Sequence, residues 1–171
     1  MRLRRVALAA FVLVLIACTP DPLPGYRAAT ADERASILAT VSEYYDIWNR
    51  AMVTADIAPL YIRHPKLAQG AVPQRGINNE GQTARLPTVA DHKITESSVD
   101  IEGYEPLRAF VKGESAVAYS HGWFTWKYAT GAPSGGELLV RFDLTRAGDG
   151  WSIERTDEWV LGEGAPPPTP R

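Results

Sequence analysis

The stretch V-R-F-D-L-T-R-A-G-D-G-W-S-I-E-R, residues 140–155, decides the fold class. Apolar and polar residues alternate up to Thr145, and the alternation resumes at Trp151 and Ile153. A period of two predicts a strand with one buried face, and a short Gly/Asp-rich break between two such runs predicts a tight turn. We therefore expect two antiparallel strands joined by a hairpin turn at residues 146–150.

Further strands are expected on the N-terminal side of this hairpin. Residues 93–101 alternate weakly, residues 106–112 form a short apolar run, and residues 116–128 and 137–145 read as long strands joined by a turn at 132–136. The last strand covers residues 151–160. Residues 65–92 are rich in Gly and Pro, which predicts a long irregular connection.

Two helices are expected before the strands. Thr30 and Glu33 have the spacing of a capping box, and a helical stripe of apolar residues follows. The stripe consists of Ile37, Val41, Tyr44, Trp48 and Met52. Asp56 can cap a second, short helix that ends at His64-Pro65. Helices followed by a run of hairpin-linked strands predict an α+β domain.

The segment W-N-R-A-M-V-T-A-D (48–56), the short helix after it and the closing hairpin resemble the nuclear-transport-factor-2-like superfamily. This superfamily includes ketosteroid isomerase and small polyketide cyclases. The resemblance implies a cystatin-like cone, with N-terminal helices packed on a bent antiparallel sheet. It implies no activity, because members include isomerases, dehydratases and proteins without catalysis. No catalytic residue is carried over.

The N-terminus has the pattern of an export signal. Three arginines precede an apolar run at residues 6–17, which is too short to span a bilayer. The run ends in Leu15-Ile16-Ala17-Cys18, which resembles the bacterial lipobox. The resemblance implies cleavage after Ala17, a diacylglyceryl group on Cys18 and a lipid-anchored, extracytoplasmic protein. An ordinary secretory signal and an uncleaved anchor are the alternatives. Arg4-Arg5 could also belong to a twin-arginine export signal, but the rest of that motif is absent.

These features divide the chain into four parts. Residues 1–17 are the signal peptide, residues 18–29 a Pro-rich tether about 30 Å long, residues 30–161 the domain, and residues 162–171 a disordered Pro-rich tail. Removal of residues 1–17 takes away three arginines and leaves 15 basic against 20 acidic residues, a net charge of −5. A mildly acidic domain is expected to stand off an anionic membrane on its tether.

Composition excludes several classes of function. A single Cys excludes a disulfide framework and a Cys-based zinc site, and the three histidines lack metal-ligand spacing. A pI of 5.9 argues against a nucleic-acid partner. No cofactor-binding motif is present, so we expect no metal and no cofactor.

Strand alternation gives one candidate pocket. Tyr119, His121 and Trp123 share one face of their strand, and Arg155 and Asp157 are expected to share a face of theirs with Trp151, Ile153 and Trp159. If that face points inward, Arg155 pairs with a buried Asp157, and His121 is the third member and a candidate acid–base residue. The alternative is an Arg–Asp pair at a partly wet strand end.

Three functions remain open. The first is a non-catalytic lipoprotein that binds a small apolar ligand or a partner protein. The second is an isomerase, dehydratase or cyclase with His121 or Asp157 as the base. The third is a dimeric structural subunit of an envelope complex that uses an outer sheet face with Phe124, Trp126 and Tyr128, so a homodimer is a further expected partner.

Overall fold

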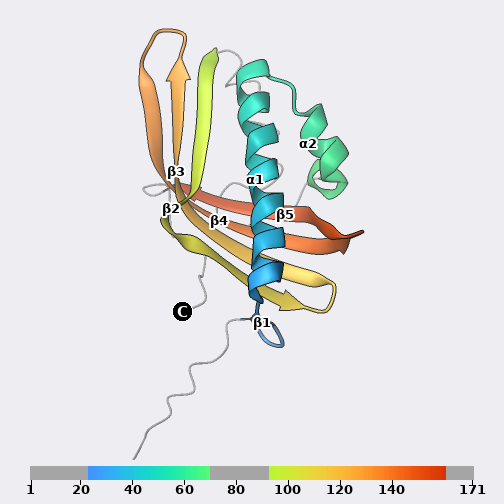
Figure 1. Cartoon of the computed structure of the whole chain (residues 1–171). Helices are drawn as coiled ribbons and strands as arrows, with labels where there is room; N and C mark the ends of the chain where they lie inside the picture. The colour runs from blue at the N-terminus through green and yellow to red at the C-terminus, as the bar shows by residue number, and fades with distance from the viewer. Residues whose placement is uncertain (1–22, 70–92, 161–171) are drawn as a thin grey trace, which may run out of the picture.

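The described part of the protein consists of helices packed on one antiparallel sheet, as the sequence predicts. The computed structural model describes residues 23–69 and 93–160. In the described part, the sheet order is β1-β2-β3-β4-β5 (Figure 1). The elements are β1 (Arg27–Ala28), α1 (Ala31–Thr54), α2 (Ala58–Arg63), the 3₁₀ helix η1 (Pro65–Gln69), β2 (Ile94–Lys112), β3 (Ser115–Tyr128), β4 (Pro133–Ala147) and β5 (Gly150–Val160).

Helix α1 begins at the predicted capping box. The Thr30 hydroxyl accepts a hydrogen bond from the Glu33 backbone N–H (3.3 Å), and the Glu33 carboxylate accepts one from the Thr30 N–H (2.8 Å). The apolar stripe is buried: Ile37, Val41 and Tyr44 are fully buried, and Trp48 is 4% exposed. Ala55 ends the helix in the left-handed region, at a φ of 57°. The predicted position of α1 on the inner face of the sheet is therefore confirmed.

The sheet bends because β2 carries extra residues opposite Gly122. Asp100 pairs with Trp123 and Glu105 with His121, so residues 101–104 face a single β3 residue. The two strands approach so closely there that a Cβ on Gly122 would lie 1.7 Å from the Asp100 carbonyl oxygen. The sequence predicts two separate strands at 93–101 and 106–112, whereas the structure has one long strand with a bulge between them.

A second irregularity in β5 corrects the predicted faces of the last strand. Leu144 pairs with Ile153 and Asp143 with Arg155, so β5 has one residue more than β4 at this point, Glu154. A one-residue bulge moves every following side chain to the other face. The prediction that Arg155 and Asp157 share a face with Trp151 and Ile153 is therefore wrong.

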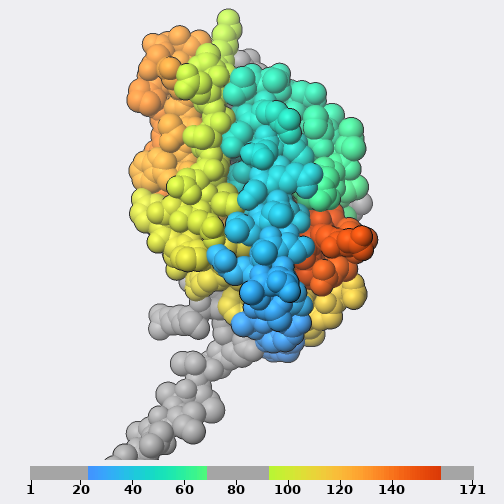
Figure 2. All heavy atoms as spheres, in the orientation of Figure 1, coloured from blue at the N-terminus to red at the C-terminus, as the bar shows by residue number. Residues whose placement is uncertain are grey.

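The core lies between α1 and the inner face of the sheet. The Tyr44 and Tyr45 rings both meet Phe142 of β4 edge to face, at centroid distances of 5.5 and 5.9 Å, and Trp48 stacks on Trp126 of β3 at 6.3 Å. Figure 2 shows α1 crossing the front of the molecule, with β2 on one side and α2 on the other. Trp126 thus faces inward, Phe124 belongs to the core and Tyr128 packs against it, so the prediction that these three residues form an outer face is wrong.

Parts of the expected irregular connection and of the expected tether form regular structure. Residues 65–69 of the predicted irregular connection form η1, while residues 70–92, the signal peptide and the predicted tail lie outside the described residues. Residues 27–28, expected in the free tether, instead form the edge strand β1. Within residues 23–69 and 93–160, no helix is long and apolar enough to cross a membrane.

The close approach at Gly122 predicts a strong and local substitution effect. Gly122→Ala should lower the free energy of unfolding by about 3 kcal/mol, the upper end for an overpacked site, because the Cβ would collide with backbone. Gly150→Ala is the control, since nothing lies within 4 Å of its added Cβ, and it should change stability by about 0.5 kcal/mol or less. Denaturant unfolding measures both, and equal losses would contradict the close approach.

Candidate functional site

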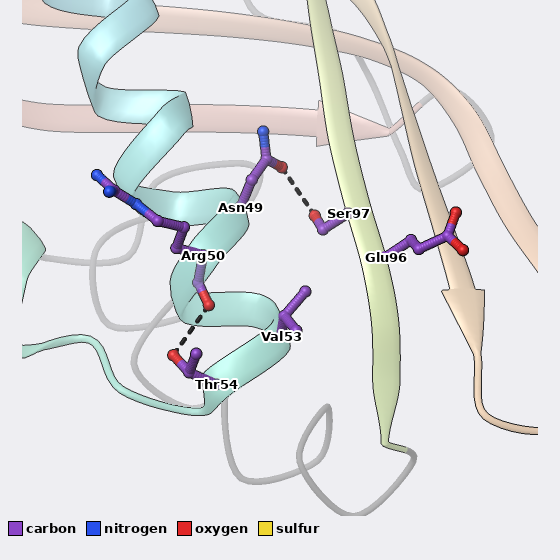
Figure 3. Close-up of a pocket in the computed structure, with 6 residues that line it drawn as sticks. All are labelled: Asn49, Arg50, Val53, Thr54, Glu96 and Ser97. Carbon is purple, nitrogen blue, oxygen red and sulfur yellow. Dashed lines mark hydrogen bonds between the residues drawn. The ribbon is translucent and has the colours of Figure 1, made fainter.

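A groove of about 370 Å³ lies between the last turns of α1 and the start of β2 (Figure 3). It is lined by Asn49, Arg50, Val53, Thr54, Glu96 and Ser97. The Ser97 hydroxyl donates a hydrogen bond to Asn49 Oδ1 (2.7 Å) and joins the two walls. Arg50 and Glu96 project away from the groove on opposite sides, whereas Val53, 43% exposed, contributes an apolar wall. The groove is therefore polar at its rim and apolar along one side.

The groove adjoins the aromatic interior of the domain. Asn49 follows Trp48 in α1, and Ser97 is the register partner of Trp126. Because directly paired residues point to the same face of a sheet, Ser97 and Trp126 both face α1. The stacked pair Trp48–Trp126 is thus next to the Asn49–Ser97 hydrogen bond.

Beside Trp48, two buried side-chain donors have no hydrogen-bond partner in the described part of the chain. They are the Tyr45 hydroxyl and the Trp126 Nε1–H. Both rings pack on Trp48, at centroid distances of 6.2 and 6.3 Å. A buried donor left without an acceptor costs about 1–3 kcal/mol, so each such group needs an explanation.

A buried carboxylate lies beside these tyrosines. Glu158 of β5 is 2% exposed and accepts a hydrogen bond from the Tyr44 hydroxyl (3.2 Å). Burial, followed by the negative charge of Glu158, raises the pKa of Tyr45 well above the ordinary value of a tyrosine. Tyr45 is therefore a neutral donor at any physiological pH, and the Glu158 carboxyl group supplies hydrogen-bond acceptors beside it.

His64 is a buried histidine of the core, with its ring centroid 6.2 Å from that of Tyr44. Its Nδ1 accepts a hydrogen bond from the Ile153 N–H (3.2 Å), so the neutral ring carries its proton on Nε2. Burial, with a smaller contribution from Arg63, lowers the pKa of His64 to about 4. The histidine therefore joins α2 to β5 in its neutral form.

The outer face of the sheet carries Arg155 and Asp157 in a square of alternating charges. Arg155 binds both Asp157 oxygens (2.7 and 2.8 Å), and Arg141 binds Asp143 (2.8 Å). Across the strands, Arg141 pairs with Asp157 and Asp143 with Arg155. Burial opposes the charge of Arg141, yet Asp143 and other neighbours raise its pKa above its ordinary value. Every nearest neighbour in the square is therefore of opposite charge.

Tyr119 lies beside this square, but His121 and Trp123 belong to a second cluster. Tyr119 pairs with Arg141, and its ring lies 5.9 Å from the Arg108 guanidinium. His121 contacts Glu137 through Nε2 and lies 3.7 Å from Glu105 through Nδ1, and the Tyr104 ring stacks on it at 4.6 Å.

The sequence predicts correctly which candidate residues share a sheet face, but not which face this is. Tyr119, His121, Trp123, Arg155 and Asp157 do share one sheet face, and Arg155 is the partner of Asp157 as expected. That face is the outer one, and His121 pairs with glutamates rather than with Asp157.

The sequence did not predict a functional role for Glu158, for Tyr45 or for the groove. The bulge at Glu154 hides the inward position of Glu158, and the consecutive polar residues Glu154-Arg155, which break the alternation, were the available signal. In residues 23–69 and 93–160, no group of three or more His, Cys, Asp or Glu side chains is placed to hold a metal ion.

The fold is that of nuclear-transport-factor-2-like proteins. The structure is similar to an NTF2-like superfamily protein from Salmonella enterica serovar Typhimurium, with a TM-score of 0.52, 15% identity, and coverage of 80% of this chain and 100% of that one. It is also similar to Aln2 from a Streptomyces species, with a TM-score of 0.50, 11% identity, and coverage of 78% and 94%. These identities carry the fold alone.

A third similar structure is an NTF2-like protein with a cystatin-like fold from Novosphingobium aromaticivorans, with a TM-score of 0.46, 14% identity, and coverage of 78% and 85%. No protein-family model and no curated protein matches the sequence.

The low pKa of His64 predicts that the protein loses stability in mild acid. The unfolded chain takes up a proton near pH 6.5 and the folded chain only near pH 4, so the unfolded state binds more protons in between. The free energy of unfolding should therefore fall by about 3 kcal/mol as the pH is lowered from 7 to 4. Denaturant unfolding at several pH values measures this fall.

His64→Asn is the matched variant, because the amide oxygen can accept the Ile153 N–H and does not titrate. It should lose clearly less stability than the parent protein over the same pH range. Parallel curves for the two proteins would mean that His64 is not responsible.

Proposed function

We propose that the protein is a bacterial envelope lipoprotein, anchored through acylated Cys18, whose domain binds a small, mostly apolar ligand without acting on it. Two of the buried donors that have no partner in the described part of the chain, Tyr45 Oη–H and Trp126 Nε1–H, carry the ligand-binding part of the proposal, because both rings pack on Trp48 next to the groove. Aromatic walls with a few placed polar groups are typical of small-molecule sites. The ligand class is therefore an aromatic or otherwise apolar molecule with a hydrogen-bond acceptor.

The groove is the entrance that this proposal assigns. Its volume of about 370 Å³ falls in the range of small-molecule sites. Breaking the single Ser97–Asn49 hydrogen bond would free an amide and a hydroxyl beside the Trp48–Trp126 pair. The ligand would then exchange one protein–protein hydrogen bond for contacts with these groups.

Glu158 supports a second candidate, an enzyme that removes a proton next to a carbonyl group. A buried carboxylate that accepts a hydrogen bond from Tyr44 is a suitable general base if a bound ligand brings an acidic C–H within reach. In that reaction Glu158 takes the proton, the C–H electron pair forms the enolate, and the proton returns to carbon. The base would then be Glu158 rather than His121 or Asp157.

A matched pair of probes tests the ligand-binding proposal. The domain should bind 2-acetylnaphthalene, which has a carbonyl acceptor, about tenfold more tightly than 2-ethylnaphthalene, which has none, because one hydrogen bond is worth about 1.4 kcal/mol. Quenching of tryptophan fluorescence measures both dissociation constants. Equal affinities, or no binding of either probe, would refute the proposed ligand class.

Two variants test whether the Tyr45 hydroxyl causes the preference for the probe with a carbonyl group. Tyr45→Phe should abolish most of this preference and leave the stability of the free domain unchanged or higher, because the hydroxyl has no hydrogen-bond partner among the described residues. Tyr44→Phe is the control, since it removes the hydrogen bond to Glu158 and should lower stability by about 1 kcal/mol. Deuterium uptake into the acetyl methyl group in D₂O, abolished by Glu158→Gln, would favour the enzyme instead.

The anchor has its own test. Mass spectrometry of the membrane fraction should find an N-terminal peptide that begins at Cys18 and carries acyl chains. Cys18→Ala should leave an uncleaved precursor, because thiol acylation precedes cleavage in the lipobox pathway that the sequence resembles. A soluble protein with an unmodified N-terminus at another residue would contradict lipidation.

A further inference from the structure

The chain that leads toward the anchor is bound to the domain from Leu23 onward. The Tyr26 N–H donates to the Leu23 carbonyl (3.0 Å), and the Ala29 N–H donates to the Ala109 carbonyl (2.9 Å). Between these bonds, β1 pairs with residues 110–111 of β2. Residues 23–29 are therefore part of the folded domain.

This attachment shortens the reach between domain and membrane. An extended chain spans at most about 3.6 Å per residue, so Cys18 lies within about 18 Å of Leu23 in any conformation. The sequence alone predicts a spacer of about 30 Å over residues 19–29. With residues 23–29 held on the sheet, about half of that length is lost.

Helix α1 separates the attachment point from the groove. Arg27, in β1, binds Glu33 in the first turn of α1 through both guanidinium nitrogens (2.7 Å each). Thr54, which lines the groove, is in the last turn. At 1.5 Å per residue, the helix places the groove about 35 Å from its N-terminal end. Figure 1 shows β1 at one end of α1 and the start of β2 at the other.

We infer that the anchored domain stands with its β1 end against the membrane and its groove directed away from it, so that the ligand enters from the aqueous compartment and not from the bilayer. The inference rests on the lipid anchor proposed above. The end near the membrane consists of β1, the start of α1 and the turn at Gly113 between β2 and β3.

The charge distribution favours the orientation with the β1 end at the membrane over one in which a side of the domain lies on the lipid surface. The charged residues described near β1 and that turn include Arg27, Lys112 and Arg146, whose backbone N–H donates to the Glu114 carbonyl, against Asp32, Glu33 and Glu114. Neither this end nor the mature chain, at −5, has the excess of positive charge that draws a surface onto anionic lipid. The short connection therefore holds the domain close without pulling a side face down.

A labelling experiment tests the orientation. Acylation consumes the only Cys of the chain, so an introduced Cys is the single free thiol of the lipoprotein. Glu114→Cys marks the turn near the membrane and Thr54→Cys the groove. Each lipoprotein carries a bimane label and is reconstituted in vesicles of phosphatidylethanolamine and phosphatidylglycerol with a nitroxide on some headgroups.

The label at position 114 should be quenched several-fold more than the label at position 54. Insertion of 20 Gly/Ser residues after Pro22 should remove most of the difference, because such a linker adds about 25 Å of mean reach. Equal quenching at both positions without the insertion, or stronger quenching at position 54, would overturn the inference.

The same samples distinguish this failure from failure of the anchor. Mass spectrometry of each labelled protein reports whether Cys18 is acylated. An acylated protein with strong quenching at position 54 refutes the orientation alone. A protein without acyl chains that does not bind the vesicles refutes the anchor, and with it the basis of the inference.

Discussion

The extra residue in β5 determines which chemistry the interior of the domain contains. Up to Ile153 the strand directs its odd-numbered side chains toward α1, and beyond Glu154 it directs the even-numbered ones there. Thr156 and Glu158 consequently enter the core, while Arg155 and Asp157 leave it. Without the bulge, an Arg–Asp pair would have to be accommodated beneath α1, and the hydrogen bond between Glu158 and Tyr44 could not form.

The elements of the fold follow from local signals, whereas the site follows from long-range ones. The capping box at Thr30 and the apolar stripe of α1 are written in adjacent residues, so both could be predicted. The Gly148–Gly150 turn is equally local. The close approach of Gly122 to Asp100, by contrast, depends on how two strands cross, and a glycine in a strand does not reveal its neighbour. For the same reason, periodicity could not reveal the groove between α1 and β2.

The polar groups on the two faces of the sheet differ in whether they have partners. On the outer face, Arg141, Asp143, Arg155 and Asp157 neutralise one another in a square, so the burial of Asp157, which is 3% exposed, needs no ligand. Between the inner face and α1, Trp126 of β3 and Tyr45 of α1 have donors without acceptors in the described part of the chain. Residues that looked most functional in the sequence are therefore internally satisfied, and the unsatisfied groups belong to residues that read as ordinary core.

In the described part of the chain, the buried donors of Tyr45 and Trp126 that lack acceptors are what supports the proposed binding site. A phenylalanine at position 45 would fill nearly the same space as Tyr45 without burying a hydroxyl, and would avoid a cost of about 1–3 kcal/mol. The same helix positions Tyr45, Trp48 and the groove residue Asn49 within two turns, and its first turn is held to the strand that continues the tether. One helix thus connects the end of the domain proposed to lie near the membrane to the proposed binding site, and its length fixes the distance between them.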